Sequence, residues 1–269
     1  MRKIVFTDLD GTLLDDNRQI TEKNRKAIQK ALSGGHQIVI TSGRPLASVK
    51  QIAADLKLDG DGCYCIASNG AVLYDCGNNK VLRQTTLSKE YIKPLFKSAH
   101  EDNIHIHTYT DDYVICEEDR EEIHWYENEI KVPALIVDSV YDYIDFNPVK
   151  IILLDLNNQQ RLINFQKKML SFTEGKMETL FSSPKILEYC PLGVSKGNAV
   201  VELCKLLNVP IENTIAAGDA ENDIPLLKAA NIGCCMQNGF ESTKAAADYI
   251  TTLNNNDSGF AEILEKFVL

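Results

Sequence analysis

Residues 4–12 read IVFTDLDGT, a short apolar run followed at once by Asp8 and Asp10. An apolar run of this length predicts a buried strand, and Gly11 predicts a turn directly after it. Two carboxylates at that point can face the same ligand, one attacking as a nucleophile while the other transfers protons. The competing interpretation is an acidic turn without catalytic function. The stretch therefore predicts a strand whose carboxyl end carries either a reactive pair or an acidic turn.

Similar apolar runs recur on both sides of a long central segment. They are HQIVIT (36–41), CYCIAS (63–68), TIAAG (214–218), IGCCM (232–236) and DYIT (248–251). Amphipathic stretches separate them, and apolar strands alternating with helices indicate a parallel sheet covered on both faces. The predicted core is therefore a Rossmann-like α/β domain that binds its ligand at the carboxyl ends of the strands.

The central segment has a different pattern, with paired strands such as HIHTYT (105–110) and YVICEE (113–118) between helices. This order predicts an inserted α+β cap domain over residues 83–189, which leaves 1–82 and 190–269 as a discontinuous core domain. His105 and His107 share one face of a cap strand. Because no further ligands are evident, we expect them at the cap surface rather than in a metal site.

Composition narrows the class of protein. The net charge of −10, from 38 acidic and 28 basic residues, argues against binding to nucleic acids or anionic membranes. The sequence has no apolar run long enough to span a bilayer and no signal-peptide pattern at its start, so a cytoplasmic location is expected. The eight cysteines do not follow zinc-site spacing and are expected to be reduced and buried.

Three further segments place polar side chains at strand ends or helix starts. Ser42, Gly43 and Arg44 follow the second run and could bind an anion or cap a helix. Lys196 begins a helix and could neutralise a phosphate or simply be solvated. Asn69, after the third run, could contact a substrate or form a turn.

A fourth segment, GDAEND (218–223), adds Asp219 and Asp223 directly after the strand TIAAG. If they converge with Asp8 and Asp10, up to four negative charges share one site. Such a site could not hold a phosphate dianion without a hard cation, and Mg²⁺ fits an oxygen-rich set of ligands.

Together these segments resemble the haloacid-dehalogenase-like hydrolases, in particular the Cof-type sugar phosphatases with a large α/β cap. The resemblance is carried by FTDLDGTLL (6–14), ITSGR (40–44), GVSKGNAV (193–200) and IAAGDAENDI (215–224), and it extends over nearly the whole chain. One phrase departs from the group, since Gln237-Asn238-Gly239 stands where Gly-Asn-Ala is usual.

The resemblance implies a role for each matching residue. Asp8 is the expected nucleophile and Asp10 the general acid and base. The expected ligands of Mg²⁺ are Asp8, the Asp10 carbonyl, Asp219 and Asp223. The residues expected to bind the phosphoryl group are Leu9, Thr12, Ser42, Gly43, Lys196 and Asn222, and Arg44 and Asn69 are the candidate substrate contacts.

The expected function is hydrolysis of a small phosphate monoester by a monomer or weak homo-oligomer. One alternative is a phosphomutase of the phosphomannomutase type, which would return the phosphoryl group to a sugar. Another is a non-catalytic phosphate-binding regulator, which would release no phosphate from any ester.

Overall fold

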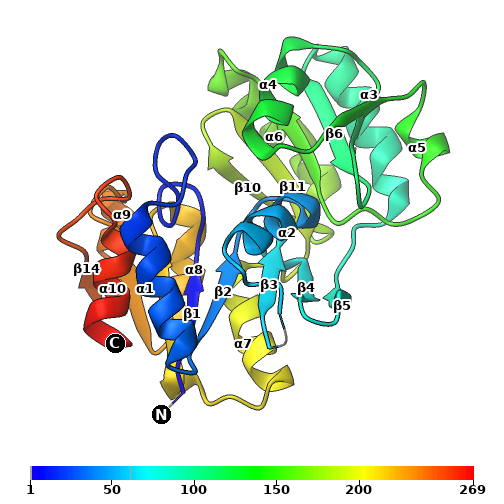
Figure 1. Ribbon diagram of the computed structural model, residues 1–269. Coiled ribbons are helices and arrows are strands. Elements are labelled where there is room, and N and C mark those ends of the chain that lie inside the picture. Colours follow the sequence, from blue (N-terminus) through cyan, green and yellow to red (C-terminus); the bar gives the residue numbers. More distant parts are fainter. Residues whose placement is uncertain (1, 61) are drawn as a thin grey trace. The chain divides into compact units, whose positions relative to one another are not determined.

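The computed structural model describes residues 2–60 and 62–269, which fall into two compact units (Figure 1). The first comprises Met1–Gly43, Val49–Arg83 and Ser195–Leu269, and the second Arg44–Ser48 and Gln84–Val194. The sequence placed the whole of 1–82 in one domain, whereas Arg44–Ser48 cluster with the second unit here.

The first unit is built on an eight-stranded sheet in the order β14-β13-β12-β1-β2-β3-β4-β5. Its strands are β1 (Ile4–Thr7), β2 (Gln37–Thr41), β3 (Tyr64–Ala67), β4 (Val72–Asp75), β5 (Lys80–Gln84), β12 (Thr214–Gly218), β13 (Ile232–Cys235) and β14 (Tyr249–Ile250). Neighbouring strands from β14 to β3 run parallel, and β4 pairs with β3 in the antiparallel direction. The predicted α/β class with a parallel core is therefore confirmed, while the antiparallel extension was not predicted.

Helices cover both faces of this sheet (Figure 1). They are α1 (Glu22–Ser33), α2 (Leu46–Asp55), α7 (Lys196–Leu206), α8 (Ile224–Ala229), α9 (Glu241–Lys244) and α10 (Gly259–Phe267), with short 3-10 turns η1 (Ser68–Gly70), η3 (Ile211–Asn213) and η4 (Glu221–Asp223). Successive side chains of β1 point to opposite faces of the sheet. Ile4 and Phe6 share one face, where they pack with α7 and α8 in one hydrophobic cluster. α1 and α10 pack together on the other face (Figure 1). α1 is capped at its start by Thr21, whose hydroxyl accepts from the N–H of Asn24.

The second unit has a six-stranded sheet in the order β10-β11-β9-β6-β7-β8. Its strands are β6 (His105–Tyr109), β7 (Val114–Cys116), β8 (Ala134–Ile136), β9 (Ile151–Leu154), β10 (Met177–Ser183) and β11 (Ile186–Pro191). Its helices are η2 (Lys89–Tyr91), α3 (Ile92–Glu101), α4 (Glu121–Ile130), α5 (Val140–Tyr143) and α6 (Gln159–Thr173). α3, α5 and α6 pack in one apolar cluster and α4 in a second, so helices lie on both sides of this sheet.

The expectation that His105 and His107 lie at the surface of this unit is wrong. Both are buried, and the two rings are joined by a hydrogen bond of 3.2 Å between Nε2 of His105 and Nδ1 of His107. His107 also stacks against Tyr126 of α4. The alternation of β6 does put them on one face, but α4 covers that face, which strand periodicity alone does not reveal.

None of the helices within the described residues is both long enough and apolar enough to cross a membrane.

Candidate active site

The carboxyl end of β1 delivers Asp8 to the edge of the core sheet. The backbone N–H of Asp8 donates to the carbonyl of Ala217 at 3.0 Å, so the pairing of β1 with β12 continues to this residue. The Asp8 side chain is buried, at 7% exposed. Burial raises the pKa of this carboxyl well above its usual range; Lys196 opposes the rise, and the neighbouring carboxylates add to it. The site thus holds its central carboxylate in an environment that disfavours an uncompensated negative charge.

The residues after Asp8 form a tight turn around the carbonyl of Leu9. That carbonyl accepts from the N–H groups of Thr12, Leu13 and Leu14. Gly11 has φ of +79°, and a Cβ there would lie 2.5 Å from Oδ2 of Asp219, so only glycine lets this turn approach the second acidic segment. Asp10 has an exposed side chain, yet its charge raises the pKa values of both Asp8 and Asp219, which places it near them.

The end of β12 and the turn η4 supply the other two carboxylates. Asp223 is fully buried, and its Oδ2 accepts from the backbone N–H groups of Asp219 and Ala220 at 3.0 and 3.1 Å. Asp219 accepts a hydrogen bond of 2.8 Å from the hydroxyl of Thr12, which orients it towards the β1 turn. Burial, followed by the charge of Asp223, raises the pKa of Asp219 to about 7. Asn222, between these two residues, is half-buried.

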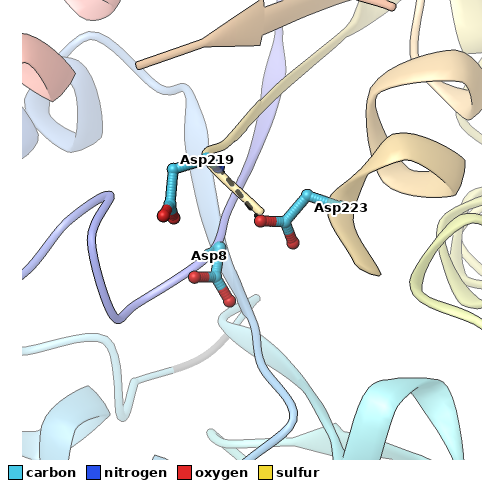
Figure 2. A group of neighbouring side chains, drawn as sticks. All are labelled: Asp8, Asp219 and Asp223. Atoms are coloured by element: carbon cyan, nitrogen blue, oxygen red, sulfur yellow. Dashed lines mark hydrogen bonds between the residues drawn. The ribbon is translucent and has the colours of Figure 1, made fainter. Parts of the chain in front are cut away.

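Three carboxylates from these two strand ends converge, as Figure 2 shows. Asp8, Asp219 and Asp223 each contribute an oxygen, and these oxygens all lie within 4.8 Å of one another. Carboxylate oxygens are the ligands that hard divalent cations prefer, and the raised pKa values show the electrostatic cost that such a cation would remove. The donor set therefore fits a divalent metal.

Lys196 lies against the same carboxylates. It is the first residue of α7, whose N-cap Ser195 accepts from the N–H of Asn198 at 3.1 Å. Its Nζ lies 2.5 Å from Oδ1 of Asp8 and 2.6 Å from Oδ1 of Asp223, and the side chain is 2% exposed. Burial opposes its charged form, but attraction to the two carboxylates outweighs that effect and raises the pKa of Lys196. The ammonium is therefore a fixed positive charge beside Asp8.

A second set of residues meets at the ends of β2 and β3. The N–H of Ser42 donates to the carbonyl of Ile66, and the N–H of Asn69 donates to the carbonyl of Ser42. A Cβ on Gly43 would lie 2.8 Å from Oδ1 of Asn69, so the loop and the turn are in close contact. A Cβ on Gly70, which has φ of +105°, would lie 2.5 Å from the carbonyl oxygen of Ser195, so this turn lies beside the start of α7.

Arg44, the last of the predicted substrate contacts, is buried and clusters with the second unit. Its guanidinium donates to the hydroxyl of Ser48 at 3.2 Å, one turn further along. Its charge also acts on the phenol of Tyr126, so Arg44 faces the α4 side of the second unit.

Sequence reasoning missed the contribution of Asn238. Its Nδ2 donates to the carbonyl of Gly11 at 2.8 Å, and its Oδ1 accepts from the N–H of Asn255 at 3.0 Å. Asn238 therefore supports the turn that carries Asp10. The signal was present, because the sequence departs from the usual phrase of the group that it resembles on both sides of this asparagine but retains the asparagine itself.

Similarity to known proteins identifies the family. The model of the haloacid dehalogenase-like hydrolases matches residues 5–264. The chain belongs to this family. The 5-amino-6-(5-phospho-D-ribitylamino)uracil phosphatase YcsE of Bacillus subtilis is 30% identical over 267 residues, covering 99% of this chain and 96% of that protein.

Two solved structures are similar to this chain over its whole length. A haloacid dehalogenase-like hydrolase from Bacteroides thetaiotaomicron superposes with a TM-score of 0.93 at 26% identity, over 99% of both chains. TM0651 from Thermotoga maritima gives a TM-score of 0.87 at 31% identity, over 100% of this chain and 98% of that one. The chain is thus an enzyme of the phosphatase class within the haloacid dehalogenase-like hydrolases.

Proposed function

We propose that this enzyme is a Mg²⁺-dependent phosphatase that hydrolyses small phosphate monoesters, sugar phosphates in particular, through an aspartyl-phosphate on Asp8. The observation that carries the proposal is the contact of Asp8 with Lys196 inside a cluster of three carboxylates at the ends of β1 and β12. A carboxylate held against a fixed ammonium is positioned to attack phosphorus while the ammonium attracts the phosphoryl oxygens.

The proposed reaction has two steps. In the first, a carboxylate oxygen of Asp8 forms a bond to phosphorus as the bond to the ester oxygen breaks, and Asp10 gives its proton to that leaving oxygen. In the second, Asp10 takes a proton from water, the water oxygen attacks phosphorus, and the bond to Asp8 breaks. Asp8 is thereby restored as a carboxylate and Asp10 as an acid, so the products are the free alcohol and inorganic phosphate.

The remaining residues have supporting roles in this proposal. Asp8, Asp219, Asp223 and the Asp10 carbonyl would hold Mg²⁺, which when bound withdraws electron density from the phosphoryl group. Lys196 favours the ionised form of the Asp8 carboxylate, since its positive charge opposes the rise in the pKa of Asp8 that burial causes. The remaining contacts to the phosphoryl group are assigned to Leu9, Thr12, Ser42, Gly43 and Asn222, with Asn69 and Arg44 assigned to the rest of the substrate.

The test is phosphate release from a panel of sugar phosphates, sugar-alcohol phosphates and nucleotides, with and without Mg²⁺. Sugar-alcohol phosphates belong in the panel because YcsE is named for a phosphorylated ribityl compound. Asp8→Asn preserves the shape of the side chain but removes the nucleophile, so turnover of every ester should be lost. Turnover that survives this substitution would exclude the covalent mechanism.

A second variant tests whether Lys196 binds the phosphoryl group. Lys196→Ala should weaken the binding of inorganic phosphate as well as turnover, because it removes the ammonium that lies 2.5 Å from Asp8. Isothermal titration with phosphate measures this directly. Phosphate affinity equal to that of the unaltered enzyme would contradict the role proposed for Lys196.

A further inference from the structure

A pair of thiols lies in the β3–β4 hairpin of the first unit, apart from the carboxylate cluster. Cys65 belongs to β3, and Cys76 directly follows β4. Their Sγ atoms are 3.3 Å apart, which is contact distance for two sulfurs. All eight cysteines of the chain are free thiols. The sequence did not suggest this pair, because ten residues separate its members.

The backbone pairing explains how these two sulfurs meet. Cys65 is opposite Tyr74, and the N–H of Cys76 donates to the carbonyl of Cys63 at 2.9 Å. Cys76 thus lies across from Cys63 along the backbone, while its sulfur is directed diagonally to that of Cys65. Diagonal neighbours on one face of an antiparallel pair are within reach of each other's side chains.

The two thiols differ in exposure and in acidity. Cys65 is buried, whereas Cys76 and Cys63 are the only partly exposed cysteines of the chain. The hydrogen bond between the two thiols lowers the pKa of Cys76, and that same bond, with burial, raises the pKa of Cys65. Burial also raises the pKa of Cys63. Because the thiolate is the reactive form, Cys76 is both the accessible and the more nucleophilic member.

We propose that Cys65 and Cys76 form a dithiol site that a peroxide oxidises to an intramolecular disulfide. The Cys76 thiolate attacks one oxygen of the peroxide, the O–O bond breaks, and a sulfenic acid forms with release of water or an alcohol. The Cys65 sulfur then attacks the Cys76 sulfur, the S–O bond breaks, and a second water carries away the Cys65 proton. Together the two thiols lose two electrons, and one peroxide molecule gains them.

The geometry needs little change for this reaction. Closing the gap from 3.3 Å to the S–S bond length of about 2.05 Å moves the sulfurs together by about 1.2 Å. Cys76 begins the turn at residues 76–79, outside the ladder of β4, so this shift does not have to displace a strand.

The disulfide would also bear on the proposed active site. It closes a loop that contains Ser68, Asn69 and Gly70, the turn that contacts the Ser42 loop and the start of α7. The carbonyl next to Cys65, that of Ile66, holds the N–H of Ser42. Oxidation therefore cross-links the segment that carries one of the candidate substrate residues.

The experiment treats the native 269-residue protein with hydrogen peroxide and measures intact mass, free thiols and disulfide-linked peptides. The expected result is a loss of about 2 Da and of two thiols, with a Cys65–Cys76 peptide that dithiothreitol separates. Cys63→Ser is the matched control from the same hairpin and should behave like the unaltered protein. Cys76→Ser, at a turn position where serine is well tolerated, should show no loss of 2 Da. Cys65→Ser removes the other sulfur of the proposed disulfide and should show no loss of 2 Da either.

Three results would overturn the proposal. The first is an unaltered protein that keeps both thiols while Cys76 is accessible to an alkylating reagent. The second is a disulfide that joins Cys63 to either partner. The third is Cys76 oxidised to a sulfinic acid while Cys65 stays free, which would show that the buried thiol cannot reach it.

Discussion

Asp219 gives the most direct test of the electrostatics of the site. Its pKa is raised to about 7, first by burial and then by the charge of Asp223. Asp219→Asn keeps the shape of the side chain and can keep the 2.8 Å hydrogen bond from Thr12, but it cannot titrate. In the absence of metal, we expect the variant to become more stable than the unaltered protein as the pH rises.

The direction and size follow from proton linkage. Between pH 3.8, the ordinary value for this group, and about 7, the native state keeps a proton on Asp219 that the unfolded state has lost. The free energy of unfolding therefore falls as the pH rises across this window. From about pH 5 to about pH 8 the group passes through roughly two pKa units, worth at most about 3 kcal/mol at 1.36 kcal/mol per unit. Solvent screening of this partly exposed side chain reduces that figure.

The assay is urea unfolding of both proteins at about pH 5 and pH 8 in the presence of a chelator. The measured quantity is the difference in unfolding free energy between variant and unaltered protein at each pH. Buried His105 and His107, whose pKa values are lowered by burial, have the opposite pH dependence. They cancel in this difference because both proteins contain them.

Mg²⁺ provides the second arm of the same test. A metal needs deprotonated ligands, so Mg²⁺ should stabilise the unaltered protein more at pH 8 than at pH 5, and the variant less at either pH. The reasoning is refuted if the difference between the two chelated proteins is the same at both pH values, or if the variant loses stability relative to the unaltered protein as the pH rises.

Two other substitutions test the packing of each unit. Gly11→Ala should lower turnover and Mg²⁺ affinity at least about tenfold, because its methyl would lie 2.5 Å from Oδ2 of Asp219. Gly35→Ala is the control, because Gly35 has the same backbone conformation (φ of +80°) but nothing lies within 4 Å of an added methyl. Equal losses in both variants would show that only backbone strain matters. Glu188→Gln should lower the free energy of unfolding by about 3 kcal/mol, because it removes the negative charge 2.9 Å from the Lys150 ammonium, whose side chain is 1% exposed. Urea unfolding measures this difference, and unchanged stability would show that the ion pair contributes little.

The core fold could be predicted from sequence because each strand of the parallel sheet is a continuous apolar run with a helix pattern on either side. β4 was missed for a physical reason: VLYD (72–75) follows β3 after only a four-residue turn, so it has no intervening helix to mark it as a separate strand. The burial of His105 and His107 was missed because a strand pattern shows which residues share a face and not which helix covers it. That information depends on contacts between segments distant in sequence.

The candidate site was predictable to a similar extent. That Asp8, Asp219 and Lys196 share one edge follows from their positions at strand ends and a helix start, and the structure brings all three together. The packing role of Gly11 and the support from Asn238 could not be predicted, because both are contacts between loops more than 200 positions apart. No local pattern encodes such contacts.

The charge of the cluster explains why metal and phosphate have to be considered together. With all three carboxylates ionised, the cluster and its one ammonium carry a net charge of −2, which repels a phosphate dianion and is cancelled by one divalent cation. Lys196 directs two of its three N–H groups to Asp8 and Asp223, and an ammonium can donate a third bond to a phosphoryl oxygen without leaving either. In the proposed function, the core site would therefore bind the phosphoryl group through charge and hydrogen bonds, whatever alcohol it is attached to. Discrimination between esters has to come from residues that contact the alcohol, for which Asn69 and Arg44 are the present candidates.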